Sequence, residues 1–295
     1  MRAVIAGHIT LDTIVVEGER KVSLGGPPLY MGLLLQRLGV EVLLLTKFGL
    51  DLGDERIAWI SRSGLKFHGN PLSSRPTTKF LIEVFREGRK LILLDRCEEI
   101  PSELPKADIL LLNPVAGEVD PMLRAEAKLI YLDPQGFLRK FEDGKVSIHH
   151  NERLLENISH FNAIKTDPEE LRTITRAGKL VEAVEELHIR GVEEVVVTLG
   201  HKGTFLSLKE RSYFIPARKV TVFDGVGMGD LLGAGYAYGR LLRGPIYGLA
   251  LGHTAATLYA DKPALGKIPP KDELLSAAER EMKKVVEVDL ESLSE

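Results

Sequence analysis

Residues 224–242 have the sequence DGVGMGDLLGAGYAYGRLL, a turn with glycine at alternate positions that leads into helix-forming residues. A predicted strand at residues 219–223 precedes this turn. Alternate glycines allow several backbone N–H groups to point the same way, and the first turn of a helix adds further unpaired N–H groups. The segment therefore predicts a strand, a turn and a helix, with an anion-binding site where the helix begins.

Asp230 is the carboxylate at the mouth of this predicted anion site. It is placed to accept the proton of an attacking hydroxyl, while the N–H groups of Gly227, Met228 and Gly229 hold the charge of a transferring phosphoryl group. The alternative interpretation is an aspartate that only caps the helix. The sequence lacks GxxxxGK[ST], lacks GxGxxG after its first strand, and lacks the HRD and DFG motifs of protein kinases.

Short runs rich in Val, Ile and Leu alternate with helical segments along most of the chain. Such runs are typical of strands buried on both faces, in a parallel sheet covered by helices. The predicted strands are Arg2–Ala6, 42–46, 109–112, 129–132, 163–165 and Glu194–Thr198; the predicted helices are 27–38, 54–63, 121–128, 178–190 and 231–242. The sequence thus predicts an α/β fold with a mostly parallel central sheet flanked by helices.

Two predicted hairpins, at residues 13–24 and 77–95, interrupt this alternation. We expect them to pair in a small separate sheet that acts as a lid; the alternative is that they extend the edge of the main sheet. The prediction divides the chain into an α/β nucleotide- and substrate-binding domain, residues 1–12, 25–75 and 101–295, and a β lid, residues 13–24 and 76–100.

The composition excludes several classes of protein. The 295 residues carry a net charge of −3 with both signs interspersed, so there is no basic stripe for nucleic acid and no polybasic segment for a membrane surface. A single cysteine, Cys97, excludes an intrachain disulfide, and no apolar run approaches the roughly 18 residues of a membrane span. We expect a cytoplasmic enzyme without nucleic-acid or membrane partners.

Several segments resemble the PfkB/ribokinase family of carbohydrate kinases. Residues 224–230 resemble the family signature DTTGAGD, and the pair Gly25-Gly26 before a helix resembles the N-terminal glycine pair. Asp12 resembles the substrate aspartate, residues 198–203 (TLGHKG) resemble the TxGxxG nucleotide turn, and residues 167–170 stand where the family has NxxE. The resemblance extends over most of the chain and implies a ribokinase-like fold with a β lid.

The resemblance implies a kinase that uses ATP and Mg²⁺ and acts on a small sugar or polyol. The implied site residues are Asp230, Gly227, Met228 and Gly229 for catalysis, Asp12, Gly25 and Gly26 for the acceptor, Thr198, Gly200, Gly203 and His253 for the nucleotide, and Asp167 and Glu170 for Mg²⁺ through water. His253 has the alternative of a helix histidine that is only packed. Because lid sheets of the family often pair, we also expect a homodimer through the lid.

Three further features bear on the acceptor. Tyr30 stands where ribokinases have an asparagine that contacts ribose, which argues against ribose. Residues 113–118 (NPVAGE) and 132–139 (LDPQGFLR) resemble a branch that includes myo-inositol kinases, which adds Asn113 and Gln135 to the acceptor site. Alternatively, Gln135 is a loop residue and Arg139 a solvated cation.

The leading acceptor is therefore myo-inositol or a similar polyol. A nucleoside or another sugar remains an alternative within the same family. So does a regulator that binds nucleotide or polyol without turnover, although such a protein has no need of Asp230. A dinucleotide oxidoreductase is disfavoured by the missing GxGxxG.

Overall fold

The structure is a computed structural model, which describes residues 1–85, 88–101, 103–123, 126–218, 225–260 and 265–293. The strand predicted at residues 219–223, together with Asp224, lies outside these residues. Within the described ranges, no helix is both long enough and apolar enough to cross a membrane.

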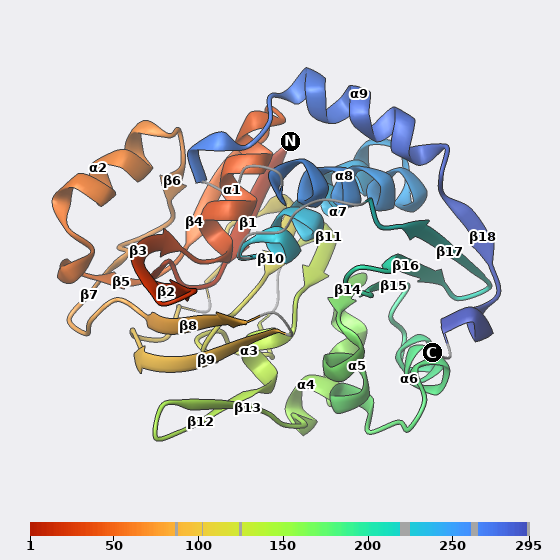
Figure 1. The fold of residues 1–295 in the computed structure, drawn as a ribbon, viewed down its shortest axis with the longest axis horizontal. Coiled ribbons are helices and arrows are strands. Elements are labelled where there is room, and N and C mark those ends of the chain that lie inside the picture. The colour runs from red at the N-terminus through yellow and green to blue at the C-terminus, as the bar shows by residue number, and fades with distance from the viewer. Residues whose placement is uncertain (86–87, 102, 124–125, 219–224, 261–264, 294–295) are drawn as a thin grey trace.

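A ten-stranded sheet forms the centre of the molecule (Figure 1). Its strands in chain order are β1 (Arg2–Ala6), β4 (Glu41–Leu45), β6 (Lys66–Phe67), β10 (Ala107–Leu112), β11 (Ala127–Leu132), β14 (Ala163–Thr166), β15 (Glu194–Thr198), β16 (Gly203–Leu208), β17 (Arg211–Pro216) and β18 (Val286–Val288). In space they lie in the order β18-β17-β16-β15-β14-β11-β10-β1-β4-β6. Neighbours from β6 to β15 pair in parallel, and β16, β17 and β18 add antiparallel pairs, so the mostly parallel sheet is confirmed.

Helices cover both faces of this sheet. They are α1 (Pro27–Arg37), α2 (Asp54–Arg62), α3 (Gln135–Leu138), α4 (Glu152–Glu156), α5 (Pro168–Thr175), α6 (Leu180–Ile189), α7 (Met228–Arg243), α8 (Pro245–Ala260) and α9 (Lys271–Met282). Successive strand residues point to opposite faces. Ile5 and Tyr131 therefore join the core with α1, α7, α8 and α9, whereas Val4 and Leu132 join a second core with α4, α5 and α6.

Helix α7, which begins with the predicted anion site, is held closely against α8 and the sheet. A Cβ on Gly235 would lie 2.8 Å from Gly252 Cα, so only glycine permits this approach of the two helices. On the sheet side, Tyr236 Oη donates to Glu194 Oε2 at 2.5 Å, and Arg240 Nε donates to Glu194 Oε1 at 2.7 Å. These contacts fix where the first turn of α7 lies.

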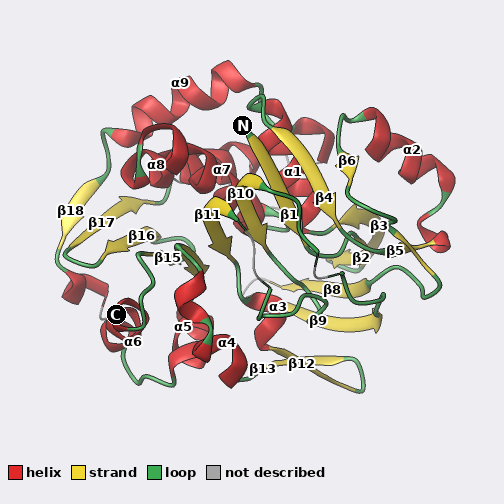
Figure 2. Ribbon diagram, turned by 180° about the vertical axis from the view of Figure 1, so that it is seen from behind, coloured by secondary structure: helices red, strands yellow, loops and turns green. Residues whose placement is uncertain are grey.

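A second, smaller sheet lies apart from the central one (Figure 2). Its strands are β2 (Thr10–Val16), β3 (Glu19–Gly25), β8 (Lys79–Phe85), β9 (Gly88–Asp95), β12 (Arg139–Glu142) and β13 (Lys145–Ile148), in the spatial order β12-β13-β9-β8-β2-β3. The two predicted hairpins do pair with each other, through β2 and β8 in parallel. The hairpin β12–β13 also joins this sheet, which its sequence did not indicate. A short pair, β5 (Phe48–Gly49) with β7 (Leu72–Ser73), lies nearby.

The helix predicted at residues 121–128 is wrong. Residues 121–122 form a turn, and β11 already begins at Ala127. Residues 121–128 favour a helix by composition, but Ala127 pairs with Ala107 of β10, and this sheet pairing overrides the local preference. The other predicted helices are present within a few residues of their expected bounds.

Candidate active site

One pocket lies between the carboxyl ends of the central strands and the small sheet. In a parallel sheet the carboxyl ends of the strands share one edge, where ligands commonly bind. The pocket is lined by Thr10, Asp12, Gly26, Pro27, Tyr30, Phe80, Ile82, Arg89, Leu91, Val115, Asp133, Gln135, Arg139, Lys165, Gly225, Val226, Gly227, Gly229 and Asp230. The predicted acceptor and catalytic segments, which are far apart in the sequence, therefore meet here.

Asp230 is the third residue of α7 and faces this pocket. The residue that caps the helix is Gly227, with φ +83°, and no side chain caps it, so the interpretation of Asp230 as a cap residue does not hold. A Cβ on Gly227 would lie 2.4 Å from the Tyr30 ring. Glycine is thus required both for the backbone angle and for the space.

A chain of amide hydrogen bonds holds the Asp230 carboxylate. Asn113 Nδ2 donates to Asp230 Oδ1 at 2.9 Å, and Asn113 Oδ1 accepts from Gln135 Nε2 at 2.8 Å. Arg139 Nη2 in turn donates to Gln135 Oε1 at 2.7 Å. This series of hydrogen bonds fixes Oδ1 of Asp230 and leaves Oδ2 without a described partner. Asn113, predicted as an acceptor ligand, has both amide atoms engaged in this chain.

Arg139 ends this chain and is not a solvated cation. It is half-buried, donates through Nη1 to Val115 O at 3.0 Å, and lies 5.7 Å above the Phe80 ring centroid. Burial lowers the pKa of its guanidinium. Gln135 is likewise part of α3 rather than a loop. Both residues therefore belong to the wall of the pocket.

A buried ammonium group, Lys165, lies beside the anion site. Its Nζ donates to Asp133 Oδ2 at 2.5 Å, and a Cβ on Gly229 would lie 3.2 Å from the same Nζ. Burial alone would lower the pKa of Lys165, but the Asp133 and Glu170 carboxylates outweigh it and the pKa is raised. Lys165 is therefore charged, and its ammonium group lies beside Gly229 of the predicted anion site.

Burial and neighbouring carboxylates raise the pKa of Asp230, in the pocket, and of Glu170, outside its lining. Loss of hydration raises the pKa of Asp230 to about 7; Asp133 adds to this, and Lys165 and Asn113 oppose it. Loss of hydration and Asp133 likewise raise the pKa of Glu170 to about 7. A carboxylate whose pKa lies near neutral pH is suited to accept a proton during turnover.

Asp12 and Gly26 also line the pocket, and Gly25 lies against the Asp12 side chain. Thr10 Oγ1 donates to Asp12 Oδ2 at 2.7 Å, and the N–H of Phe80 donates to Oδ1 at 3.1 Å. Burial raises the pKa of Asp12 to about 6, which both hydrogen bonds oppose. A Cβ on Gly25 would lie 2.9 Å from Asp12 Oδ2, so the glycine keeps this carboxylate accessible to a ligand.

The predicted nucleotide residues lie outside the lining of this pocket, at the neighbouring strand ends. Thr198 ends β15 and donates to Thr166 O at 3.2 Å, and Gly203 begins β16. His253, on α8, places Nδ1 3.5 Å from Thr204 Oγ1, and its buried Nε2 has no partner among the described residues. The structure thus brings His253 next to the strand that follows the TLGHKG turn.

Asp167 and Glu170 form a reciprocal cap at the start of α5. Glu170 N donates to Asp167 Oδ1 at 2.8 Å, and Asp167 N donates to Glu170 Oε2 at 3.0 Å. This cap uses one oxygen of each carboxylate. No cluster of three metal-ligating side chains occurs in the described part of the chain. Each carboxylate keeps a second oxygen outside the cap, which fits the hydrogen bonds that would hold a hydrated Mg²⁺ through water.

Three charged residues of the pocket were missed in the sequence: Asp133, Lys165 and Arg89. Asp133 directly follows the apolar strand β11, and Lys165 is the next-to-last residue of β14. Polar residues at the carboxyl ends of parallel strands lie at the edge of the sheet where ligands commonly bind. Arg89 comes from β9 of the small sheet and lines the pocket. Nothing in its local sequence indicated this position.

The fold and the pocket define an enzyme that transfers a phosphoryl group to an alcohol. A model of the family described as pfkB family carbohydrate kinase matches residues 6–271. The chain belongs to the pfkB family of carbohydrate kinases. It is thus a kinase of the group that acts on sugars and nucleosides.

Two curated relatives match most of the chain. A cytidine kinase of Thermococcus kodakarensis is 25% identical over 256 residues, which cover 81% of this chain and 90% of that protein. A ribokinase of Haemophilus influenzae is 25% identical over 273 residues, covering 88% of each chain. Their acceptors differ, so these relatives support the kinase class without selecting one acceptor.

Solved structures support the fold. A pyrophosphate-dependent kinase of the ribokinase family, complexed with a pyrophosphate analogue and myo-inositol, superimposes with a TM-score of 0.81 at 18% identity. The match covers 93% of this chain and 99% of that chain. At this identity the likeness confirms the ribokinase-like fold alone.

Proposed function

We propose that the protein transfers the terminal phosphoryl group of ATP to a hydroxyl of a small polyol, with myo-inositol as the leading acceptor. The observation that carries the proposal is the pocket itself. Asp230 lies beside the amides of Gly227 to Gly229 at one end, and Asp12 offers a carboxylate for hydroxyl groups at the other. Both carboxylates line the same pocket, so one acceptor molecule could contact Asp12 and Asp230 at the same time.

Each group of the pocket has a role in this reaction. Asp12 accepts hydrogen bonds from acceptor hydroxyls and orients the ring. Asp230 takes the proton of the attacking hydroxyl, while Asn113 holds the carboxylate in place. The amides of the turn and the Lys165 ammonium stabilise charge on the phosphoryl oxygens. Mg²⁺, near Asp167 and Glu170 through water, supplies further neutralisation of phosphate charge when bound.

The lining of the pocket favours an uncharged polyhydroxy acceptor, the class to which myo-inositol belongs. The acids Asp12, Asp133 and Asp230 and the bases Arg89, Arg139 and Lys165 all line it, so neither sign predominates there. The inositol-bound neighbour adds support from the fold. Because that neighbour is described as pyrophosphate-dependent, the phosphoryl donor is tested together with the acceptor.

An acceptor screen tests the proposal. The protein is incubated with Mg²⁺ and either ATP or inorganic pyrophosphate, and with myo-inositol, ribose, fructose, cytidine and adenosine in turn. We expect ADP release that depends on myo-inositol and one phosphomonoester in the ³¹P NMR spectrum. Turnover with cytidine alone would show that the acceptor is a nucleoside and not myo-inositol. Turnover with pyrophosphate alone would show that the donor is pyrophosphate and not ATP. Binding without turnover for every pair would contradict the kinase proposal.

Replacing Asp12 tests the acceptor side. We expect Asp12→Ala to raise the KM for the acceptor by about tenfold or more, because it removes a carboxylate that accepts hydroxyl hydrogen bonds. The Kd for ATP, measured by calorimetry, should stay near that of the unmodified protein. An unchanged acceptor KM would remove Asp12 from the site.

The pH dependence of the rate tests Asp230 as the base. The pKa of Asp230 is raised to about 7, and only the deprotonated carboxylate accepts a proton. We therefore expect kcat/KM to rise with pH through about 7 and to level off at higher pH. The measurement is the initial rate at saturating Mg·ATP from acidic to mildly alkaline pH. A rate that is flat across this window would contradict the assignment.

We also infer a homodimer through the outer face of the small sheet. Val22, Thr13, Leu81 and Ile92 are aligned across four neighbouring strands on the face opposite the pocket. None of them belongs to either core, and charged residues of both signs border them. Such an apolar patch with a mixed rim suits a second copy of the same chain. Light scattering should give a dimer mass, and a monomer mass for Leu81→Lys; a monomeric unmodified protein would contradict the inference.

A further inference from the structure

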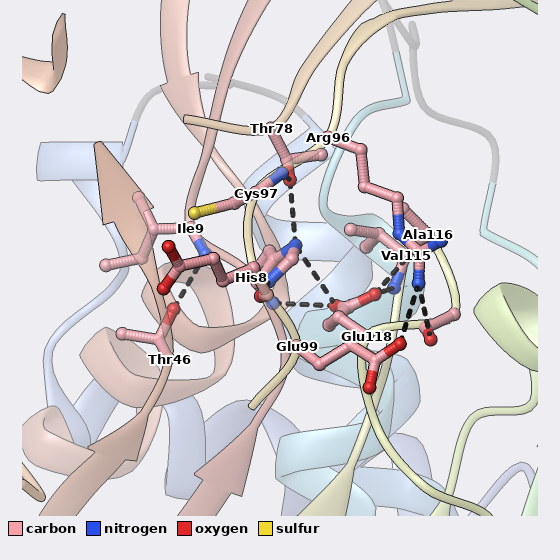
Figure 3. Close-up of polar contacts among 12 residues, drawn as sticks. His8, Ile9, Thr46, Thr78, Arg96, Cys97, Glu99, Val115, Ala116 and Glu118 are labelled. Atoms are coloured by element: carbon pink, nitrogen blue, oxygen red, sulfur yellow. Dashed lines mark hydrogen bonds and ion pairs between the residues drawn. The ribbon is translucent and has the colours of Figure 1, made fainter. Parts of the chain in front are cut away.

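The segments that connect the two sheets meet at one fully buried histidine, His8 (Figure 3). Residues 7–9 lead from β1 of the central sheet into β2 of the small sheet. Thr78 immediately precedes β8, and residues 96–98 follow β9. The chain therefore passes between the sheets three times within reach of the His8 side chain.

The His8 ring joins the other two connecting segments. Its Nδ1 lies 2.7 Å from Thr78 Oγ1, and its Nε2 lies 2.7 Å from the carbonyl oxygen of Glu98. A carbonyl only accepts, so Nε2 carries the proton. Thr78 Oγ1 accepts from Cys97 N at 3.0 Å and can donate its own proton to Nδ1. Both ring nitrogens of His8 are thus paired, and Nδ1 also lies 4.0 Å from Glu118 Oε1.

The backbone of His8 is tied to the loop that leads to the catalytic end of the pocket. The buried Glu118 carboxylate accepts from the N–H groups of His8 at 2.8 Å, Val115 at 3.0 Å and Ala116 at 2.7 Å (Figure 3). Residues 113–118 also carry Asn113, which bonds to Asp230. A buried carboxylate with this many N–H donors holds all of them rigidly.

The segment after β9 is bonded to the same loop. Arg96 Nη2 donates to Gly117 O at 2.9 Å, and Ile100 N donates to Glu118 O at 2.8 Å. The position of the small sheet is therefore linked through His8 and Glu118 to residues 113–118. Through Asn113, the same linkage reaches Asp230.

We propose that His8 is a positioning residue whose contacts with Thr78 and Glu118, together called the clasp, hold the small sheet in place over the pocket. The clasp thereby couples the position of this sheet to the placement of Asp230. The proposal rests on the proposed function for its catalytic consequence. When the clasp is broken, the sheet covers the pocket less firmly, and water competes with the acceptor for the phosphoryl group.

The structure offers a matched control in His188. Its ring makes the same kinds of bond, Nδ1 at 2.8 Å from Val192 O and Nε2 at 2.8 Å from Ser207 Oγ, but it joins α6 to the central sheet. Loss of either ring removes one bond to a carbonyl and one to a hydroxyl, and loss of the His188 ring also removes the acceptor of a bond from Lys209 N at 3.3 Å. Only the loss of His8 should affect the small sheet.

The first test is hydrogen–deuterium exchange, which needs no substrate. In His8→Ala, and in Thr78→Val, which keeps the side-chain shape, we expect amides of β8, β9 and residues 113–118 to exchange about tenfold faster. His188→Ala should leave these segments unchanged. The proposal would be overturned if the amides of β8 and β9 exchanged as slowly in both variants as in the unmodified protein. It would also be overturned if these amides exchanged faster while those of residues 113–118 did not.

The second test measures how ATP is partitioned. We expect Thr78→Val to raise ADP release without acceptor, relative to phosphoryl transfer, by about tenfold, while His188→Ala keeps the ratio unchanged. An unchanged ratio in Thr78→Val would overturn the catalytic part of the proposal. If the unmodified protein transfers no phosphoryl group to any acceptor, the proposed function fails, and the exchange experiment still decides whether the clasp exists.

Discussion

Asp230→Asn lowers kcat for phosphoryl transfer by about three orders of magnitude, which is the contribution expected of a well-placed general base. The substitution keeps the shape of the side chain, and its amide oxygen can still accept from Asn113 Nδ2. What it removes is the ability to take the proton of the acceptor hydroxyl. The measurement is single-turnover transfer from Mg·ATP to the acceptor that the screen identifies.

A matched variant separates this loss from a change in the helix. Asp272 lies in the first turn of α9, as Asp230 lies in the first turn of α7, but it is exposed and does not line the pocket. Asp272→Asn should therefore retain the full rate. The Tm of Asp230→Asn should not fall, because the substitution removes a buried charge. Near-normal turnover in Asp230→Asn would contradict the mechanism.

The sequence predicted the central sheet and the turn before α7 because each is encoded locally. Apolar strands buried on both faces leave a run of Val, Ile and Leu, and the glycine turn before Asp230 has few alternative conformations. Asp230 was found from this turn, whereas Asp12 and Gly26 were found only through the resemblance to a family. The resemblance to a family then supplied roles that composition does not contain.

What the sequence did not predict depends on contacts between distant segments. The hairpin β12–β13 has no local feature that assigns it to the small sheet, since its partner β9 lies about fifty residues earlier in the chain. The hydrogen bonds of the Asn113 amide to Asp230 and Gln135 likewise join residues far apart in the sequence. Lys165 was taken as part of a strand, because its pairing with Asp133 exists only after folding.

Lys165→Met should lower the free energy of unfolding by about 3–5 kcal/mol, the range seen when one partner of a buried ion pair is removed. The Lys165 side chain is 10% exposed and that of Asp133 is 1% exposed, so the remaining carboxylate would stay buried without its cation. The measurement is urea unfolding at pH 7. Adding Asp133→Asn to Lys165→Met should recover much of the loss, because it removes the unpaired charge.

The same variant connects stability to catalysis. Lys165 opposes the rise in the pKa of Asp230, so its removal should move the rising limb of the pH–rate profile to higher pH. Lys106→Met is the control: Lys106 pairs with Glu126 at 2.6 Å, but both side chains are largely exposed, so water already solvates the partner that remains. We expect no change in its urea midpoint. If Lys165→Met and Lys106→Met had equal urea midpoints, the Lys165–Asp133 pair would be effectively hydrated. The anion site beside Gly229 would then lack the desolvated cation that is proposed to stabilise charge there.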